Sequence, residues 1–361
     1  MRAALVHEPG AALELRDDVT VAGPDPGEVR VRVRATGVCH SDVSALKGVL
    51  PASLPAVLGH EAAGEVVEAG SQVTGLAPGD HVILSFIPPC GSCADCLGGQ
   101  PYLCITYVLE GFTKPRFRLG DGTPCFGFGG LGAWAEELVV PAQAAIKIDP
   151  DVPFELAALL SCAVATGVGA VINTARVEEG ASVVVIGAGG IGLSVIQGAR
   201  LAGAATILAV DPIEAKHEAA RRFGATHATT PEQMEAVKGL LTGGRGFDHA
   251  FEAVGRSSTV KAAWQAARRG GDVVVVGAGA VDDQVEIDAF SLLFDGKNIL
   301  SSIYGCSDLR RDARRFVDLW RAGRLDLESL ITRRIGFEDL ADAVLALDKG
   351  GDVIRQVVLF D

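Results

Sequence analysis

Four cysteines form the densest group of potential metal ligands in this sequence. Two, two and seven residues separate Cys90, Cys93, Cys96 and Cys104. Four thiolates from one short segment can complete the tetrahedral shell of a zinc ion and leave no position open for a reactant. The spacing therefore predicts a structural zinc site that stabilises a loop. Two alternatives stay open at this point: a pair of disulfides, and an iron–sulfur cluster, which also takes four cysteines.

A second group of chemically active residue types is dispersed along the chain. It comprises two short clusters and a distant cysteine: Cys39-His40-Ser41-Asp42, His60-Glu61 and Cys162. Each of these residue types can bind a metal or move a proton, but spacing alone does not join positions this far apart. A cysteine in an apolar helix is also ordinary core packing.

The third chemical signature is a glycine-rich turn between an apolar run and a helical pattern. Gly187 permits the turn, Gly189 lets the backbone approach a pyrophosphate, and Gly192 lets the helix pack close to the strand. The helix N-terminus then offers free N–H groups to the phosphates. Asp211 follows the next strand, where a carboxylate can bind the adenosine ribose and repel a 2′-phosphate. The pattern predicts NAD as the cofactor; a glycine-rich turn without a ligand is the alternative.

Two segments with different patterns of apolar and polar residues must position these residues. In the first 150 residues, short alternating runs such as Val29–Arg34 are separated by turn pairs, which predicts a compact β-rich domain. The stretch 105–132 is predicted to be a long, irregular loop. A helical segment, Pro153–Thr174, then leads into strands that alternate with helices, as in a doubly wound parallel sheet. The six predicted strands are Val183–Ile186, Thr206–Val210, Thr226–Ala228, Asp248–Phe251, Val273–Val276 and Asn298–Ile303.

Length and composition bound the class of protein. A chain of 361 residues exceeds one ordinary core, so two domains are expected. Lys and Arg total 32 against 45 Asp and Glu, and no basic stripe is present, which argues against a nucleic-acid partner. No signal peptide is recognisable, and the apolar stretch Leu156–Ile172 is better explained as a buried helix than as a membrane span. We therefore expect a cytoplasmic protein whose eight cysteines serve metals or reactivity before disulfides.

Over essentially its whole length, the sequence resembles the zinc-dependent alcohol dehydrogenases of the medium-chain dehydrogenase/reductase superfamily. The matching motifs are Gly37-Val-Cys39-His-Ser41-Asp42, Gly59-His60-Glu61-Ala-Ala-Gly64, Pro78-Gly79-Asp80, the four-cysteine lobe, Cys162 with Thr166-Gly167, Gly187–Gly192, Asp211 and Arg355. The resemblance implies an α/β fold with a GroES-like catalytic domain, residues 1–163 completed by 304–361, and a Rossmann NAD-binding domain, residues 164–303. It also implies one catalytic and one structural zinc ion per chain, NAD, and an active site in the cleft between the domains.

By this resemblance Cys39, His60 and Cys162 are the ligands of the catalytic zinc, with a fourth position open to substrate. Bound zinc acts as a Lewis acid, lowers the pKa of an alcohol and so prepares its carbon to release hydride to the nicotinamide. In the reverse direction the zinc polarises an aldehyde or ketone carbonyl.

Further roles are implied one residue at a time. Ser41 matches the hydroxyl that starts proton transfer, Asp42 matches an acid that orients His60, and Glu61 matches a second acid near the metal. Several relatives carry a histidine three residues after the relay hydroxyl, and the residue here is Ser44, so water or His40 is left to complete the proton path.

The resemblance also assigns residues to the cofactor and the substrate. His40 and Arg355 match contacts to the pyrophosphate, Thr166 a residue near the nicotinamide, and Lys216 one near the adenosine ribose. The implied pocket is mostly apolar, which favours aliphatic or aromatic alcohols; its residues are Leu50, Phe86, Phe128, Trp134 and Ile303. The stretch 105–132 resembles the longer lobe of dimeric relatives, so a homodimer is expected, with a homotetramer as the alternative.

Other functions remain open from the sequence. Close alternatives are a formaldehyde dehydrogenase acting on a thiol adduct and a nicotinoprotein alcohol dehydrogenase that never releases NAD. A non-catalytic NAD-sensing zinc protein belongs to a different class, but such a sensor has no need of a second, open zinc site. Zinc-free reductases of the superfamily lack these ligands.

Overall fold

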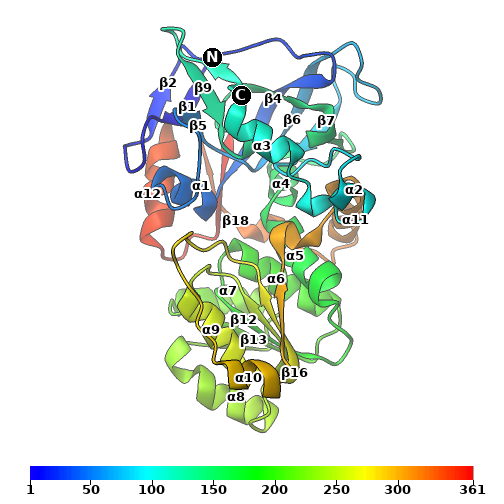
Figure 1. The fold of residues 1–361 in the computed structure, drawn as a ribbon, viewed down its shortest axis with the longest axis vertical. Helices are drawn as coiled ribbons and strands as arrows, with labels where there is room; N and C mark the ends of the chain where they lie inside the picture. The colour runs from blue at the N-terminus through cyan, green and yellow to red at the C-terminus, as the bar shows by residue number, and fades with distance from the viewer. Residues whose placement is uncertain (361) are drawn as a thin grey trace. The chain divides into compact units, whose positions relative to one another are not determined.

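The computed structural model describes residues 1–360 and divides the chain into two compact units (Figure 1). The first unit comprises Met1–Cys162, Asp308–Ala322 and the C-terminal part from Leu327. The second comprises Ala163–Ser307 and Gly323–Asp326. Each unit has its own hydrophobic core and its own sheet system. The expected α/β class, with a GroES-like part and a Rossmann part, is confirmed.

The long strand β4, Glu28–Val38, organises the first unit. Its valines at 29, 31 and 33 are buried, while the arginines between them pair with glutamates on neighbouring strands. This is the alternation expected of a strand with one apolar face. The strand lies in a seven-stranded sheet, ordered β11-β7-β6-β4-β19-β18 with β10 also paired to β4. The other strands of this sheet are β6 (Ala62–Ala69), β7 (His81–Leu84), β10 (Glu137–Pro141), β11 (Ala145–Lys147), β18 (Ile331–Ile335) and β19 (Arg355–Leu359).

A second sheet of the first unit is ordered β2-β1-β5-β9-β8-β3. Its strands are β1 (Ala3–Val6), β2 (Glu14–Arg16), β3 (Thr20–Val21), β5 (Ala56–Val57), β8 (Phe117–Arg118) and β9 (Pro124–Gly127). The predicted irregular loop 105–132 is therefore wrong in part, since it contains β8, β9 and the helix α3, Thr106–Thr113. The helix and the strand pair satisfy backbone groups that a buried loop would leave unpaired.

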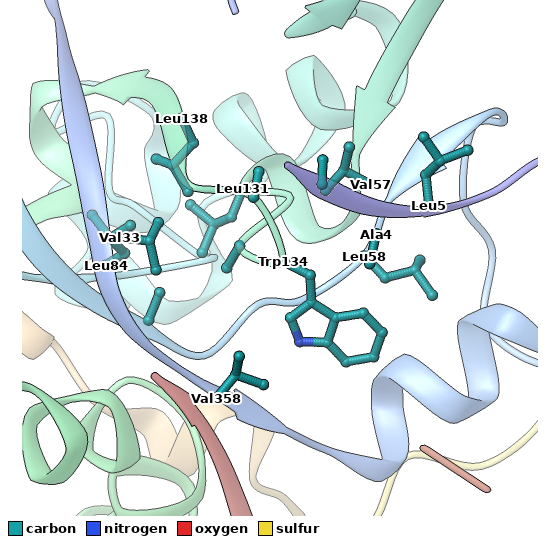
Figure 2. Close-up of a cluster of buried hydrophobic side chains, with 14 of the residues drawn as sticks. Ala4, Leu5, Val33, Val57, Leu58, Leu84, Leu131, Trp134, Leu138 and Val358 are labelled. Atoms are coloured by element: carbon teal, nitrogen blue, oxygen red, sulfur yellow. The ribbon is translucent and has the colours of Figure 1, made fainter. Parts of the chain in front are cut away.

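Trp134 lies in the core of the first unit, among Leu5, Val33, Leu131 and Leu138 (Figure 2). Its side chain is fully buried, and its indole N–H donates to the carbonyl of Gly37 at 3.1 Å. The expectation that Trp134 lines a substrate pocket is therefore corrected: this side chain is core.

The second unit contains a six-stranded parallel sheet, as predicted. Its order is β14-β13-β12-β15-β16-β17, with the change of direction between β12 and β15. The strands are β12 (Ser182–Ile186), β13 (Thr206–Val210), β14 (His227–Thr229), β15 (Phe247–Glu252), β16 (Ala267–Val275) and β17 (Asn298–Ser301). The connecting helices are α6 (Gly190–Leu201), α7 (Ala215–Phe223), α8 (Met234–Thr242), α9 (Ser257–Ala266) and α10 (Ala289–Phe294). In such sheets ligands bind at the carboxyl ends of the strands, near the change of direction.

The predicted helix Pro153–Thr174 is not continuous. Helix α4, Phe154–Leu160, ends before Ser161 and Cys162, and α5 begins at Ala163. Among residues 1–360 no single helix is long and apolar enough to cross a membrane, although α4 and the helical stretch Ala163–Ala175 pass that test as a bent pair.

Candidate active site

The dispersed cysteines and histidine come together within the first unit. Cys39 caps the N-terminus of α1, His40–Leu46; His60 and Glu61 directly precede β6; and Cys162 lies between α4 and α5, directly before α5. One ligand atom from each of Cys39, His60, Glu61 and Cys162 lies within 4.8 Å of the others, and all four residues are buried. The three residues expected as zinc ligands are thus brought together, and the structure adds the carboxylate of Glu61 to the donor set.

Asp42 holds two of these residues in place. One carboxylate oxygen accepts a hydrogen bond from Nδ1 of His60 at 2.9 Å and from the backbone N–H of Gly59 at 3.1 Å. The other oxygen accepts from the backbone N–H of Cys39 at 3.1 Å. Because Nδ1 is engaged, Nε2 is the nitrogen free to bind a metal, which is the usual arrangement for a ligating histidine. Asp42 is fully buried, and burial raises the pKa of its carboxyl.

The two buried thiols behave as a pair. Their mutual hydrogen bond lowers the pKa of Cys39 well below its ordinary value and raises the pKa of Cys162, while the Arg355 guanidinium also lowers the pKa of Cys39. Both thiols lie within ligand distance of one another and of His60. A divalent cation in this group would hold both sulfurs as thiolates.

Glu61 and Arg355 form a buried ion pair beside the thiols. Nη1 of Arg355 lies 3.1 Å from Oε1 of Glu61, but the geometry is not that of a hydrogen bond, and both carboxylate oxygens lack a hydrogen-bonding partner among the described residues. Burial raises the pKa of Glu61 to about 7, although Arg355 lowers it. A Cβ at Gly37 would lie 2.1 Å from Oε2 of Glu61, so a side chain at position 37 would displace this carboxylate.

This donor set fits zinc. Two thiolates, an imidazole and a buried carboxylate without hydrogen bonds carry a charge of about −3, which one divalent cation and Arg355 would balance. Sulfur and nitrogen donors together favour zinc over magnesium or calcium. Sequence reasoning missed the roles of Gly37 and of the Glu61–Arg355 pair, because both depend on contacts between strands distant in the chain.

The lobe of four cysteines is a second, separate donor set. The ligand atoms of Cys90, Cys93, Cys96 and Cys104 all lie within 4.8 Å of one another, and all eight cysteines are free thiols. Backbone N–H groups donate to three of the sulfurs at 3.3–3.5 Å. The Thr106 hydroxyl and the N–H groups of Ser92 and Cys93 lower the pKa of Cys90 to about 5. The lobe is thus prepared for a tetrahedral Cys₄ zinc site rather than for disulfides.

The surroundings of His60 are polar on one side and aromatic on another. The rings of Phe86 and Phe128 meet the imidazole edge-on, with centroid distances of 5.3 and 5.7 Å. The Ser41 hydroxyl lies 3.9 Å from the sulfur of Cys39 and is half-buried, whereas His40 is exposed. A reactant at this centre would therefore meet a hydroxyl and two phenyl rings.

The glycine turn forms the start of α6 in the second unit. Gly187 has φ +96°, and a Cβ at Gly192 would meet the carbonyl oxygen of Gly187 at 1.8 Å. A Cβ at Gly189 would meet nothing within 4 Å, so the side of the turn next to Gly189 is open. Such an open cradle at a helix N-terminus fits a pyrophosphate.

Asp211 closes this turn. Its carboxylate accepts from the backbone N–H groups of Ala188 at 2.8 Å and Ile213 at 2.9 Å, and Nζ of Lys216 lies 3.9 Å away. Thr166 is buried on α5. Sequence reasoning missed His217, whose Nε2 donates to the carbonyl of Asp211 at 2.8 Å and so fixes the loop between β13 and α7.

Comparison with known proteins places the whole chain in one group. Residues 25–150 match the family described as the alcohol dehydrogenase GroES-like domain, and residues 190–320 match the family described as zinc-binding dehydrogenase. The chain is 38% identical to an alcohol dehydrogenase class-3 of Cereibacter sphaeroides and 37% identical to an S-(hydroxymethyl)glutathione dehydrogenase of Paracoccus denitrificans, each over 99% of both chains.

A solved structure supports the same grouping. The benzyl alcohol dehydrogenase of Acinetobacter calcoaceticus superposes with a TM-score of 0.90 at 31% identity, covering 100% of this chain and 99% of the other.

Proposed function

This chain belongs to the zinc-dependent alcohol dehydrogenase family and is an NAD-dependent oxidoreductase acting on CH–OH groups, and we propose that its substrates are apolar alcohols. The reverse reaction would reduce the corresponding aldehydes or ketones. The observation that carries the proposal is the pair of phenyl rings, Phe86 and Phe128, against the candidate ligand His60. Such rings favour an aliphatic or aromatic alcohol over a sugar or a charged acid, because they offer no partner to further hydroxyls or charges.

We assign Cys39, His60 and Cys162 as the residues that would hold the catalytic zinc, and Cys90, Cys93, Cys96 and Cys104 as those that would hold the structural zinc. When bound, the catalytic ion supplies Lewis acidity toward the alcohol oxygen. The Ser41 hydroxyl accepts the alcohol's proton at Oγ and passes its own proton outward. Asp42 keeps His60 in the ligating orientation, and Glu61 with Arg355 sets the charge behind the thiolates.

We propose that Gly187, Gly189 and Gly192 cradle the pyrophosphate of NAD, which supplies the hydride acceptor when bound. His40 and Arg355 are proposed as further contacts to the pyrophosphate, and Thr166 as a contact to the nicotinamide. Asp211, with Lys216, would bind the adenosine ribose. The Asp211 carboxylate supports a preference for NAD over NADP, because it would repel a 2′-phosphate.

A thiol adduct of formaldehyde is the second candidate substrate. It is favoured by the likeness to the S-(hydroxymethyl)glutathione dehydrogenase of Paracoccus denitrificans. Benzyl alcohol, a simple aliphatic alcohol, and formaldehyde with and without a low-molecular-weight thiol should be assayed with NAD and with NADP. We expect the highest kcat/KM for an apolar alcohol with NAD. A higher kcat/KM for formaldehyde with thiol than for either alcohol would contradict the apolar-alcohol proposal, and a strong NADP preference would contradict the role of Asp211.

A nicotinoprotein remains a further variant of this proposal. Gel filtration of the purified enzyme distinguishes a nicotinoprotein, which never releases NAD, from an enzyme that exchanges it, because an exchanging cofactor is lost on the column and a resident one is retained. We expect NAD to be lost.

We propose that the enzyme is a homodimer in the cytoplasm. Support for the dimer comes from exposed apolar side chains in α10, where Phe290 and Leu293 are 71% and 74% exposed, and from the neighbouring β17, which is the edge strand of the parallel sheet. A second copy could cover both. Support for the location comes from the eight free cysteines, six of which lie in two thiolate sites that need a reducing compartment. Light scattering should give twice the chain mass, and Leu293→Lys should shift it toward the monomer.

A further inference from the structure

Glu252 is a buried carboxylate that the assigned catalytic roles do not use. It ends β15 at the carboxyl edge of the parallel sheet, directly opposite Ile186 of β12 and Val275 of β16. Its side chain is fully buried. A buried carboxylate is costly unless hydrogen bonds compensate it, so its partners indicate what it does.

All of those partners converge on one oxygen. Oε1 accepts from the backbone N–H groups of Val254 and Gly255, each at 2.8 Å, and from the hydroxyl of Thr259 on α9 at 2.7 Å. Oε2 is buried and has no hydrogen-bonding partner among the residues that the structure describes. The carboxylate therefore closes the chain after β15 into a tight turn and ties that turn to the next helix.

This turn borders the glycine turn of the cofactor site. A Cβ at Gly187 would meet a methyl group of Val254 at 2.8 Å, and the N–H of Ala253 donates to the carbonyl of Ile186 at 2.9 Å. On its other side, a Cβ at Gly277 would meet the nitrogen of Gly255 at 2.2 Å.

The main chain of Glu252 also hydrogen-bonds to the residues that follow β16. Its carbonyl accepts from the N–H groups of Val276 at 2.9 Å and Gly277 at 3.0 Å. The ends of β12, β15 and β16 are thus joined by hydrogen bonds around Glu252.

We propose that Glu252 is a positioning residue for the dinucleotide: its carboxylate fixes the turn 253–255, and that turn fixes the shape of the glycine cradle. Glu252 acts through Val254 and Gly255 and needs no contact with NAD. The inference rests on the proposed seat of the cofactor at Gly187–Gly192.

The opposite end of the same strand offers a matched control. Asp248 is the second residue of β15, and its carboxylate also has three donors: the N–H and hydroxyl of Ser182 at 2.8 and 2.7 Å, and Nε of Arg268 at 2.6 Å. It lies at the amino end of the strand, away from the edge where ligands bind. Losing this carboxylate should weaken the unit without reshaping the cradle.

The test measures NADH binding by fluorescence titration of the zinc-loaded enzyme, together with melting temperature and zinc content. We expect Glu252→Ala to raise the Kd for NADH and the KM for NAD by about fivefold or more, because three donors lose their acceptor. Glu252→Gln keeps an acceptor for those donors and should stay within about twofold of wild type. Asp248→Ala should lower the melting temperature and leave the Kd unchanged. Thr259→Val, which removes one donor only, serves if Glu252→Ala does not fold, and should give a smaller rise in Kd.

Two outcomes would overturn the inference and can be told apart from failure of the proposed function. Equal effects of Glu252→Ala and Asp248→Ala on the Kd would mean that Glu252 acts only through stability. An unchanged Kd in Glu252→Ala would remove the positioning role. Gly189→Val tests the proposed seat of the cofactor separately from the role of Glu252. It should weaken NADH binding if the cofactor sits on the glycine turn, whatever Glu252 does. If Gly189→Val also has no effect, the proposed seat itself is wrong.

Discussion

At the scale of single residues, the candidate metal centre depends on one carboxylate. Asp42 orients the imidazole of His60 and also accepts the N–H of Cys39, so it links two ligands that come from different parts of the first unit. Partners of this kind typically change metal affinity by about 10–100-fold. Asp42→Ala should therefore release the catalytic zinc about 10–100-fold more readily than wild type during dialysis against a chelator of graded strength. Retention of both zinc ions at wild-type affinity would contradict this role.

Ser41 and Ser44 provide an internal comparison for the proton relay. The Ser41 hydroxyl lies beside the sulfur of Cys39, whereas Ser44 lies one turn further along α1. Loss of a proton-transfer group typically lowers turnover by about 10²–10⁴-fold, so Ser41→Ala should reduce kcat by about 100-fold or more and Ser44→Ala much less. Ser41→Thr restores a hydroxyl and should recover most of the rate. Steady-state kinetics decides the matter: equal losses at both serines would remove the relay assignment.

At the scale of elements, the glycines of the α6 turn have separable roles. A Cβ at Gly192 would lie 1.8 Å from the carbonyl oxygen of Gly187, so Gly192→Ala must push the helix from the strand and should cost about 1–3 kcal/mol of unfolding free energy. A Cβ at Gly189 meets nothing, so Gly189→Val should melt at the wild-type temperature. Thermal denaturation of the cofactor-free variants tests this contrast. A large loss of stability in Gly189→Val would show that the turn is packed where the structure leaves it open.

Strand β15 carries a carboxylate, that of Asp248, whose contribution to stability should depend on pH. Burial raises the pKa of Asp248, but the hydrogen bonds from Ser182 and Arg268 outweigh it and lower the pKa from 3.8 to about 2. Because the folded-state pKa is the lower one, the carboxylate stabilises the protein above pH 4, and this contribution disappears as the pH falls toward 2. The free energy of unfolding of wild type should exceed that of Asp248→Asn by about 1–2 kcal/mol near neutral pH. The difference in melting temperature between the two proteins should narrow below pH 4. A gap that stays constant from pH 6 to pH 3 would contradict the assignment.

The elements also show where sequence reasoning succeeds and where it stops. The strands of the parallel sheet are predictable because each is an apolar run bounded by turn residues, as in Thr206–Val210, whose predicted bounds match the structure. The break at Ser161 and Cys162 is not predictable, because apolar residues continue through it without proline. In the structure the carbonyl of Ala158 accepts both the backbone N–H of Ser161, at 3.2 Å, and the Ser161 hydroxyl, at 2.6 Å, so Ser161 bonds back to the last turn where α4 ends.

At the scale of the whole molecule, local spacing revealed the four-cysteine lobe but could not reveal the catalytic group. Cys39, His60 and Cys162 are joined only by the folding of the first unit, so the sequence links them through family resemblance and not through their spacing. The fourth donor, Glu61, depends on Gly37 in the neighbouring strand β4, where a missing side chain makes the space. A glycine that makes room for a side chain of another strand follows no recognisable pattern in the sequence.

The two donor sets together predict the metal content of the intact chain. Each set gathers its ligand atoms within 4.8 Å and shares no residue with the other, so zinc should bind at both independently. Atomic emission should find two zinc ions per wild-type chain and one in each of Cys162→Ser and Cys90→Ser. The phenotypes should differ: Cys162→Ser should lose activity with a small fall in melting temperature, whereas Cys90→Ser should melt markedly earlier, because the lobe loses the closed site that orders it. A single zinc in the wild-type chain, lost in Cys90→Ser and kept in Cys162→Ser, would contradict the catalytic assignment and leave only a structural metal.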